Sequence, residues 1–279
     1  EEDSMAQAVN LAKTSDAVIL VVGTNSDWET EGNDRSTLDL PGRQNELIQK
    51  VVKENPNTVV VVNTGSPVSM PWLNDAKAIL QSWFPGQEFG NALFDILFGE
   101  VNPSGKLTTT FPKRLEDTPA FEHYPGENLQ MDYLEEIFVG YRWYDKKEIE
   151  PLFPFGFGLS YTEFEYSDLK IVPPKKEDSA IAFSFRVINT GKMRGKEIAQ
   201  CYVSVANSSV ERSFKELKCF SKIDLDSGKS ELLNFELNER DLSYWNEDGG
   251  GWLIEPAEYK ILVGSSSKDI LLEASVWLG

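Results

Sequence analysis

The sequence has few of the side chains on which many catalytic and metal sites depend. Among 279 residues there is one histidine, His123, and there are two cysteines, Cys201 and Cys219. Two cysteines cannot build a disulfide scaffold, no Cys/His metal cluster is possible, and a Ser-His or Cys-His dyad would need His123 itself. This scarcity leaves carboxylates as the candidate catalytic groups. We expect no metal ion and no organic cofactor. Both cysteines lie in strand-like segments, which favours buried thiols over a disulfide.

Basic residues and long apolar runs are also scarce. Lys and Arg number 27 against 45 Asp and Glu, so the net charge is −18, and no basic cluster offsets it. Like-charge repulsion therefore excludes nucleic acid and an anionic membrane surface as partners. The longest apolar run, residues 17–22, is far shorter than the ~20 residues that cross a bilayer, which excludes a membrane-spanning protein. The compartment stays open, with a preference for the cytoplasm.

The first part of the chain, residues 1–111, alternates apolar runs with amphipathic stretches. Buried strands are predicted over residues 17–22, 58–62 and 78–83, and helices after a cap at Ser4, over 43–53 and over 87–97. Continuous Val/Ile runs between amphipathic helices are typical of a parallel sheet with helices on both faces. We therefore predict an α/β domain with a mostly parallel sheet.

Two further regions follow. Residues 112–160 are rich in proline and aromatic side chains, which would be costly to leave in water, so we predict a structured linker packed on the first domain. In residues 161–279 the apolar period becomes 2. Strands are predicted there over residues 180–187, 198–203, 232–237 and 259–263, with turn signals between them. This pattern predicts a small β-sandwich.

Candidate chemistry lies in the loop after the first predicted strand, residues 23–35. Within nine residues it carries four carboxylates, an indole and a guanidinium. In parallel α/β sheets, ligands bind beyond the carboxyl ends of the strands, where this loop is expected. Carboxylates accept hydrogen bonds from hydroxyls, and an indole offers a flat apolar face to a pyranose, so the loop suits a sugar. From residue chemistry alone, a solvated acidic loop is an equal alternative.

A series of short motifs extends over nearly the whole chain. They are WETEGNDR (28–35), DLP (39–41), TGSPV (64–68), PSGKL (103–107), IFVGYR (137–142) and FPFGFGLSY (153–161). In this order they resemble the carboxy-terminal half of family 3 glycoside hydrolases of the β-glucosidase type. The resemblance implies that residues 1–111 are the carboxy-terminal portion of an α/β sandwich domain. Residues 161–279 are similar to the fibronectin-III-like domain, an immunoglobulin-like β-sandwich, that closes many of these enzymes.

The resemblance also implies an activity. Such enzymes are retaining, exo-acting β-glucosidases that hydrolyse terminal non-reducing β-D-glucosyl residues of a β-glucoside or oligosaccharide. Their general acid/base is a Glu on the sandwich domain, and their nucleophilic Asp lies on a separate (β/α)8 barrel domain. The Glu-Gly pair of the family loop falls on Glu31-Gly32, so Glu31 is the implied acid/base. The barrel is then expected from a preceding segment or another chain, with the two carboxyls about 5–5.5 Å apart.

A second carboxylate of the loop, Asp27, lies in a triplet that could be mistaken for the nucleophile motif of the family. Ser26-Asp27-Trp28 resembles the triplet in which family members carry the nucleophile, but there it ends a barrel strand. Here Asp27 lies four residues before Glu31 on one loop, and both would approach the sugar from the same side. We therefore do not expect Asp27 to be the nucleophile. We expect Glu29 to be a solvated neighbour.

Two other side chains of the loop are candidate substrate ligands. Trp28 either lines the sugar site or anchors the loop. Arg35 either binds substrate or pairs with Asp34 or Glu31, and the pairing is favoured.

Two rival functions stay open. One is a noncatalytic carbohydrate-binding or scaffold protein that keeps the fold, because no nucleophile is identified in this chain. The other is a nucleotide-binding protein, which is disfavoured because Gly23-Thr24-Asn25 has no glycine fingerprint for a pyrophosphate.

Overall fold

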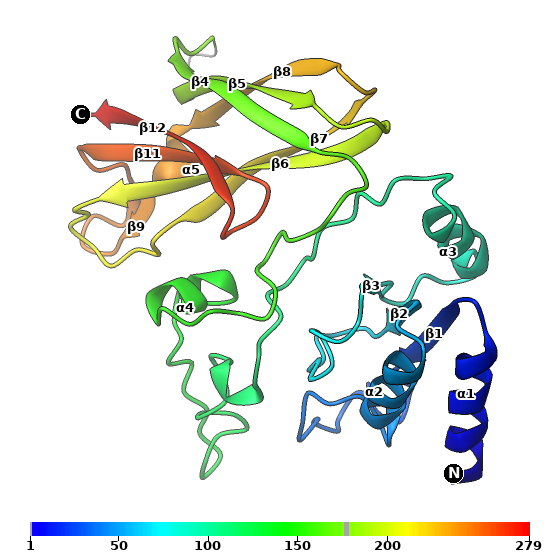
Figure 1. Ribbon diagram of the computed structural model, residues 1–279. Coiled ribbons are helices and arrows are strands. Elements are labelled where there is room, and N and C mark those ends of the chain that lie inside the picture. The colour runs from blue at the N-terminus through cyan, green and yellow to red at the C-terminus, as the bar shows by residue number, and fades with distance from the viewer. Residues whose placement is uncertain (1, 176–178) are drawn as a thin grey trace. The chain divides into compact units, whose positions relative to one another are not determined.

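The computed structural model describes residues 2–175 and 179–279 (Figure 1). These residues form two compact units. The first contains the residues up to Ala92 together with Phe111–Phe121, and the second contains Leu93–Thr110 together with Glu122–Gly279. No helix within the described residues has both the length and the apolar character that crossing a bilayer requires. The predicted boundaries at residues 111 and 160 stay a prediction.

The first unit is built on a parallel sheet with the strand order β1-β2-β3. Its strands are β1 (Val18–Gly23), β2 (Thr58–Asn63) and β3 (Ala78–Gln81), and its helices include α1 (Glu2–Thr14) and α2 (Gln44–Glu54). Helix α3 (Phe89–Leu97) follows, and a short 3-10 helix covers Leu115–Asp117. The predicted parallel α/β arrangement is confirmed.

Burial in the first unit centres on β2 and α2. The middle of β2 is completely buried, and α2 turns Ile48, Val51 and Val52 into the core beside it. Helices α1 and α2 pack side by side (Figure 1). Asn55, just after α2, donates hydrogen bonds to the carbonyls of Ala12 and Ser15 at 2.9 and 2.8 Å, which attaches the end of α1.

Two expectations for the first unit are wrong. Ser4 does not cap a helix, because α1 already begins at Glu2 and Ser4 lies within it. The sheet is not covered on both faces along β1, where Ile19 and Val21 are each 50% exposed. Alternate side chains of β1 point to opposite faces of the sheet, and the described part of this unit leaves the face of Ile19 and Val21 open at this strand.

The second unit is dominated by an antiparallel sandwich, as predicted. One sheet has the order β12-β11-β6-β7 and the other the order β4-β5-β8. The strands are β4 (Phe164–Val172), β5 (Ser179–Asn189), β6 (Gly195–Ala206), β7 (Glu216–Leu225), β8 (Ser230–Asn238), β11 (Ala257–Gly264) and β12 (Ile270–Leu278). Short elements lie between β8 and β11: α5 (Glu239–Leu242), β9 (Tyr244–Asn246) and β10 (Gly251–Leu253).

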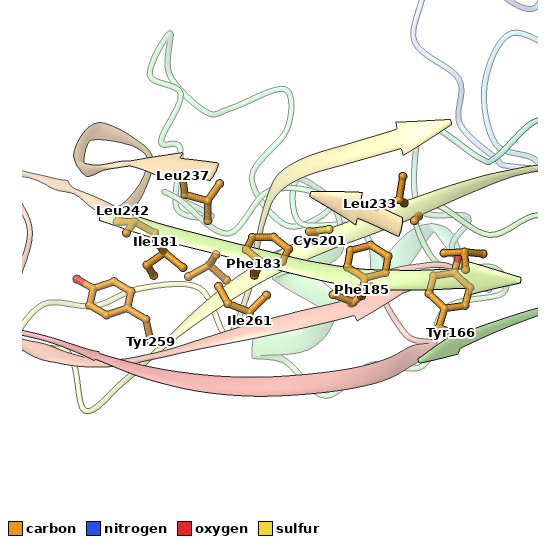
Figure 2. Packing of buried hydrophobic residues seen from close by; sticks show 14 of the residues in the cluster. Tyr166, Ile181, Phe183, Phe185, Cys201, Leu233, Leu237, Leu242, Tyr259 and Ile261 are labelled. Atoms are coloured by element: carbon orange, nitrogen blue, oxygen red, sulfur yellow. The ribbon is translucent and has the colours of Figure 1, made fainter. Parts of the chain in front are cut away.

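The core of the sandwich is aromatic and aliphatic. Figure 2 shows side chains from β4, β5, β6, β8 and β11 gathered between the two sheets. Phe183 and Phe185 are fully buried and stack on Phe235, with ring centroids 5.4 and 5.8 Å apart. Cys201 faces Cys219 across β6 and β7, and both thiols are free. The period-2 pattern thus reflects one buried face on each sheet.

The segment before the sandwich packs differently from our expectation. We expected residues 112–160 to pack on the first domain, but most of them, from Glu122 onward, group with the sandwich. Helix α4 (Tyr141–Lys146) places the Tyr141 ring 5.3 Å from that of Phe155 and 5.8 Å from that of Tyr202 on β6. Tyr141 therefore packs against an aromatic side chain of the sandwich, whereas Tyr124 and Tyr133 of the same segment are 50% and 73% exposed.

Candidate active site

The loop that carries the candidate residues leaves the carboxyl end of β1. Gln44, at the start of α2, holds this point: its side chain accepts a hydrogen bond from the Gly23 N–H at 2.7 Å and donates one to the Gly23 carbonyl at 2.8 Å. The next amide, of Thr24, donates to the Asn63 carbonyl at the end of β2, at 3.2 Å. The loop therefore begins beside the turn that follows β2, at the sheet edge where ligands bind in parallel α/β folds.

Asn25 shapes the first turn of the loop. Its Oδ1 accepts hydrogen bonds from the amides of Asp27 and Trp28, both at 3.1 Å, and its carbonyl accepts from the amides of Trp28 and Glu29 at 3.0 and 2.9 Å. Trp28 is half-buried. Its Nε1–H is buried and has no hydrogen-bond partner among the described residues.

Glu29 is not the solvated neighbour that we expected. Its Oε1 accepts a hydrogen bond from the Thr24 hydroxyl at 2.5 Å and another from the Gly65 amide at 3.0 Å. Gly65 belongs to the turn after β2, so this carboxylate connects the loops that follow two neighbouring strands. The side chain is half-buried. Spacing along the sequence could not reveal the contact, because Glu29 and Gly65 are 36 residues apart.

Arg35 also contacts the turn after β2. Its Nη1 donates to the Ser66 hydroxyl at 2.6 Å, and both terminal nitrogens lie 3.4 Å from the Pro67 carbonyl. Burial lowers the pKa of the guanidinium, and the charge of Glu29 opposes that shift. The Arg35 Nε–H is buried and lacks a partner in the part of the chain that the structure describes. The favoured pairing with Asp34 or Glu31 stays a prediction, and the turn after β2 is an additional anchor for Arg35 that was not predicted.

Glu31 differs from Glu29 in its exposure and in its hydrogen bonding. It is exposed, and within residues 2–175 and 179–279 its carboxylate has no hydrogen bond or ion pair. Gly32 follows with a φ of +82°, a backbone conformation that favours glycine. The chain therefore turns sharply next to the unpaired carboxylate.

A shallow, open depression of about 420 Å³ collects these side chains. It is lined by Trp28, Glu29, Thr30, Glu31, Asn33, Asp34, Arg35 and Ser66. Asp27 is exposed and does not line it. No group of three or more metal-ligating side chains occurs among the described residues. The depression thus contains an exposed carboxylate that has no partner among the described residues, and two of its lining side chains, Trp28 and Arg35, have buried N–H groups that also lack a partner there.

No role was predicted for the turn after β2. Thr64-Gly65-Ser66-Pro67-Val68 was used only as a motif, whereas Gly65 and Ser66 supply partners for two loop side chains. A signal was available, because this turn follows the second predicted strand, and strands that are consecutive in the sequence are usually neighbours in the sheet.

Comparison with known proteins identifies similar sequences. Residues 2–161 match the glycosyl hydrolase family 3 C-terminal domain, and residues 197–267 match the fibronectin type III-like domain. The chain is 46% identical to thermostable beta-glucosidase B from Acetivibrio thermocellus over 277 residues, which are 99% of this chain and 37% of that protein. It is also 46% identical to a beta-glucosidase from Kluyveromyces marxianus over 275 residues, 97% of this chain and 32% of that protein.

Solved structures of similar proteins are also β-glucosidases. The crystal structure of the Kluyveromyces marxianus beta-glucosidase in complex with glucose is similar, with a TM-score of 0.93 and 46% identity over 99% of this chain and 33% of that one. A family 3 beta-glucosidase from Bifidobacterium adolescentis has a TM-score of 0.95 and 42% identity over 100% of this chain and 41% of that one. The chain therefore spans only about a third of the length of the curated relatives that it matches.

Proposed function

Because the chain belongs to glycosyl hydrolase family 3, we propose that it is the part of a retaining, exo-acting β-glucosidase that supplies the general acid/base, Glu31. In this proposal the nucleophile lies on a (β/α)8 barrel domain outside this chain. The substrate is a β-glucoside or oligosaccharide that ends in a non-reducing β-D-glucosyl residue. The names of the similar proteins, which are β-glucosidases, support this substrate class.

The observation that carries the proposal is the contrast between two glutamates of one loop. The Glu29 carboxylate already accepts hydrogen bonds from Thr24 and Gly65, so it is held in the protein. Glu31 lines the same depression with no partner among the described residues. A group that must give a proton to a substrate and later take one from water needs an oxygen that no protein donor occupies.

The proposed chemistry follows from two carboxyl groups on opposite sides of the glycosidic bond. Protonated Glu31 donates its proton to the leaving oxygen while the barrel carboxylate attacks the anomeric carbon and forms a glucosyl-enzyme. Glu31, now ionised, takes a proton from water as that water attacks the same carbon, which releases glucose and restores the starting protonation state.

Trp28 and Arg35 are the proposed substrate ligands. Each has a buried N–H group without a partner in the described residues, and both side chains line the depression. Sugar hydroxyl oxygens are acceptors that satisfy such donors once binding of the sugar turns the N–H groups toward the depression. Trp28→Phe keeps an aromatic ring, though a smaller one, and removes the donor, so we expect it to raise KM in the complete enzyme, with a smaller change in kcat.

The acid/base role is tested in the complete enzyme with Glu31→Gln. This variant keeps the shape of the side chain and removes its proton. We expect kcat/KM for cellobiose, a poor leaving-group substrate, to fall by about 10²–10⁴-fold. Hydrolysis of 4-nitrophenyl β-glucoside should lose less in the glycosylation step, because nitrophenolate departs with little protonation. Added azide should restore deglycosylation and produce β-glucosyl azide.

Asp27→Asn is the matched control, since it removes one carboxylate from the exposed part of the same loop. It should leave both substrates hydrolysed at the parental rates. Equal losses on both substrates in Glu31→Gln, without azide rescue, would contradict the proposal. Binding of glucose to the complete protein without any turnover would instead favour the noncatalytic carbohydrate-binding alternative.

A further inference from the structure

We propose that Glu29 is a positioning residue, which attaches the Glu31 loop to the turn after β2 and thereby sets where the Glu31 carboxyl lies. This inference rests on the proposed function, because it assigns a role relative to Glu31. It gives Glu29 no proton-transfer step. The argument depends on three structural features of this connection.

The first feature is a single oxygen atom shared by two loops. Glu29 Oε1 accepts from the Thr24 hydroxyl at 2.5 Å and from the Gly65 amide at 3.0 Å. Thr24 directly follows β1, and Gly65 lies two residues after β2, so the ends of two adjacent parallel strands are joined through one side chain. Hydrogen bonds to a charged acceptor are the stronger ones, so this connection restrains the loop more than a neutral contact would.

The second feature is the space at Gly65. A Cβ atom at this position would lie 2.3 Å from Glu29 Oε2 and 2.6 Å from Cε2 of Phe84. The backbone of Gly65 does not have a positive φ, so it is space and not backbone conformation that favours glycine here. Any side chain at residue 65 would displace the Glu29 carboxylate from its two donors or shift Phe84.

The third feature is the position of Glu31 between two attachments. Glu29 binds Gly65 on one side of it, and Arg35 binds Ser66 at 2.6 Å on the other. Glu31 therefore lies in a short span whose two ends are attached to the same turn. Its carboxylate has no hydrogen-bond partner of its own among the described residues. The two attachments therefore orient Glu31 in place of a direct hydrogen bond to its carboxylate.

The test uses the complete enzyme and two substitutions at Glu29. Glu29→Ala removes the acceptor, whereas Glu29→Gln keeps an oxygen that can accept from Thr24 and Gly65. We expect Glu29→Ala to lower kcat/KM for cellobiose by about 10- to 100-fold, the range that a misplacement near 1 Å produces. The fall in kcat/KM for 4-nitrophenyl β-glucoside should be several-fold smaller. Glu29→Gln should retain most of the parental kcat/KM on both substrates.

Gly65→Ala provides the same displacement from the opposite side. The variant leaves Glu29 itself unchanged, but its new methyl group occupies the space of Glu29 Oε2. It should therefore reproduce the substrate-selective fall in kcat/KM that we expect for Glu29→Ala. Asp27→Asn again serves as the matched loop control. Thermal unfolding of each variant is measured in parallel, so that the test remains decisive if one variant unfolds.

The results separate three cases. Equal losses on both substrates that follow the fall in Tm would make Glu29 purely structural and overturn the inference. If kcat/KM falls as far in Glu29→Gln as in Glu29→Ala, and azide produces β-glucosyl azide, then Glu29 is the acid/base. That result would overturn the proposed function as well. If the Glu29 variants lower kcat/KM equally on both substrates while Glu31→Gln lowers it more on cellobiose, only the positioning role is overturned.

Discussion

Asp145 and Lys215 form an ion pair that is almost completely removed from solvent, with side chains 6% and 4% exposed. Lys268 contacts the other carboxylate oxygen of Asp145 at 3.1 Å. Asp145 belongs to α4 and Lys215 directly precedes β7, so the pair attaches this helix to the sandwich. Burial lowers the pKa of Lys215, and its hydrogen bond to Asp145 opposes that shift.

We expect Asp145→Asn to lower the free energy of unfolding of the sandwich by about 3–5 kcal/mol, because it leaves Lys215 buried without a counter-ion. Urea unfolding followed by tryptophan fluorescence measures the change. Asp168→Asn is the control: its pair with Arg186 is exposed and spans 3.8 Å, so its loss should cost at most about 1 kcal/mol. Similar costs for the two variants would contradict the prediction.

Ser66→Ala tests the attachment of Arg35. It removes the acceptor of a 2.6 Å hydrogen bond from a half-buried guanidinium, and bonds to charged groups are worth about 1.5–3 kcal/mol. We expect a fall of that size in the free energy of unfolding of the first unit, and a higher KM in the complete enzyme. Ser26→Ala, on the exposed part of the same loop, should change neither quantity. An unchanged KM in Ser66→Ala would argue against Arg35 as a substrate ligand.

The Glu46 carboxylate in α2 should make the stability of the protein depend on pH. Hydrogen bonds from Arg43 and Lys50 lower the pKa of its carboxyl to about 2. Since the folded pKa lies below the unfolded one, the stabilising contribution is complete above about pH 4.5 and disappears as the pH falls toward 2. Glu46→Gln should therefore lower Tm at pH 7, and the difference from the parental protein should shrink steadily between pH 4.5 and pH 2. A difference that is constant over this range would refute the assignment.

The isolated chain of 279 residues should show no β-glucosidase turnover, because in our proposal it lacks the nucleophile. The assay uses the purified chain with an aryl β-glucoside, and the complete enzyme at equal molarity is the positive control. Clear turnover that is abolished by Asp27→Asn would make Asp27 the nucleophile and remove the need for a barrel.

Much of the architecture was predictable from local patterns. The Val-rich run of β2 and the amphipathic stretch of α2 were placed to within a residue at each end, because both elements bury side chains with a regular period. The order of motifs identified the family, and the match over residues 2–161 confirms it. The capping role of Ser4 was wrong, since a capping residue is recognised only by where the helix actually begins.

The sequence by itself determined which residue types are available: a loop rich in carboxylates after a predicted parallel strand, with the Glu31-Gly32 pair that we predict to occupy the family position. Only the tertiary structure decided which carboxylate is held and which is unpaired. Parallel pairing of β1 with β2 brings Glu29 to Gly65, 36 residues away, and leaves Glu31 without a partner among the described residues. A hydrogen bond across that separation depends on strand register and loop path, and neither leaves a periodic trace in the sequence.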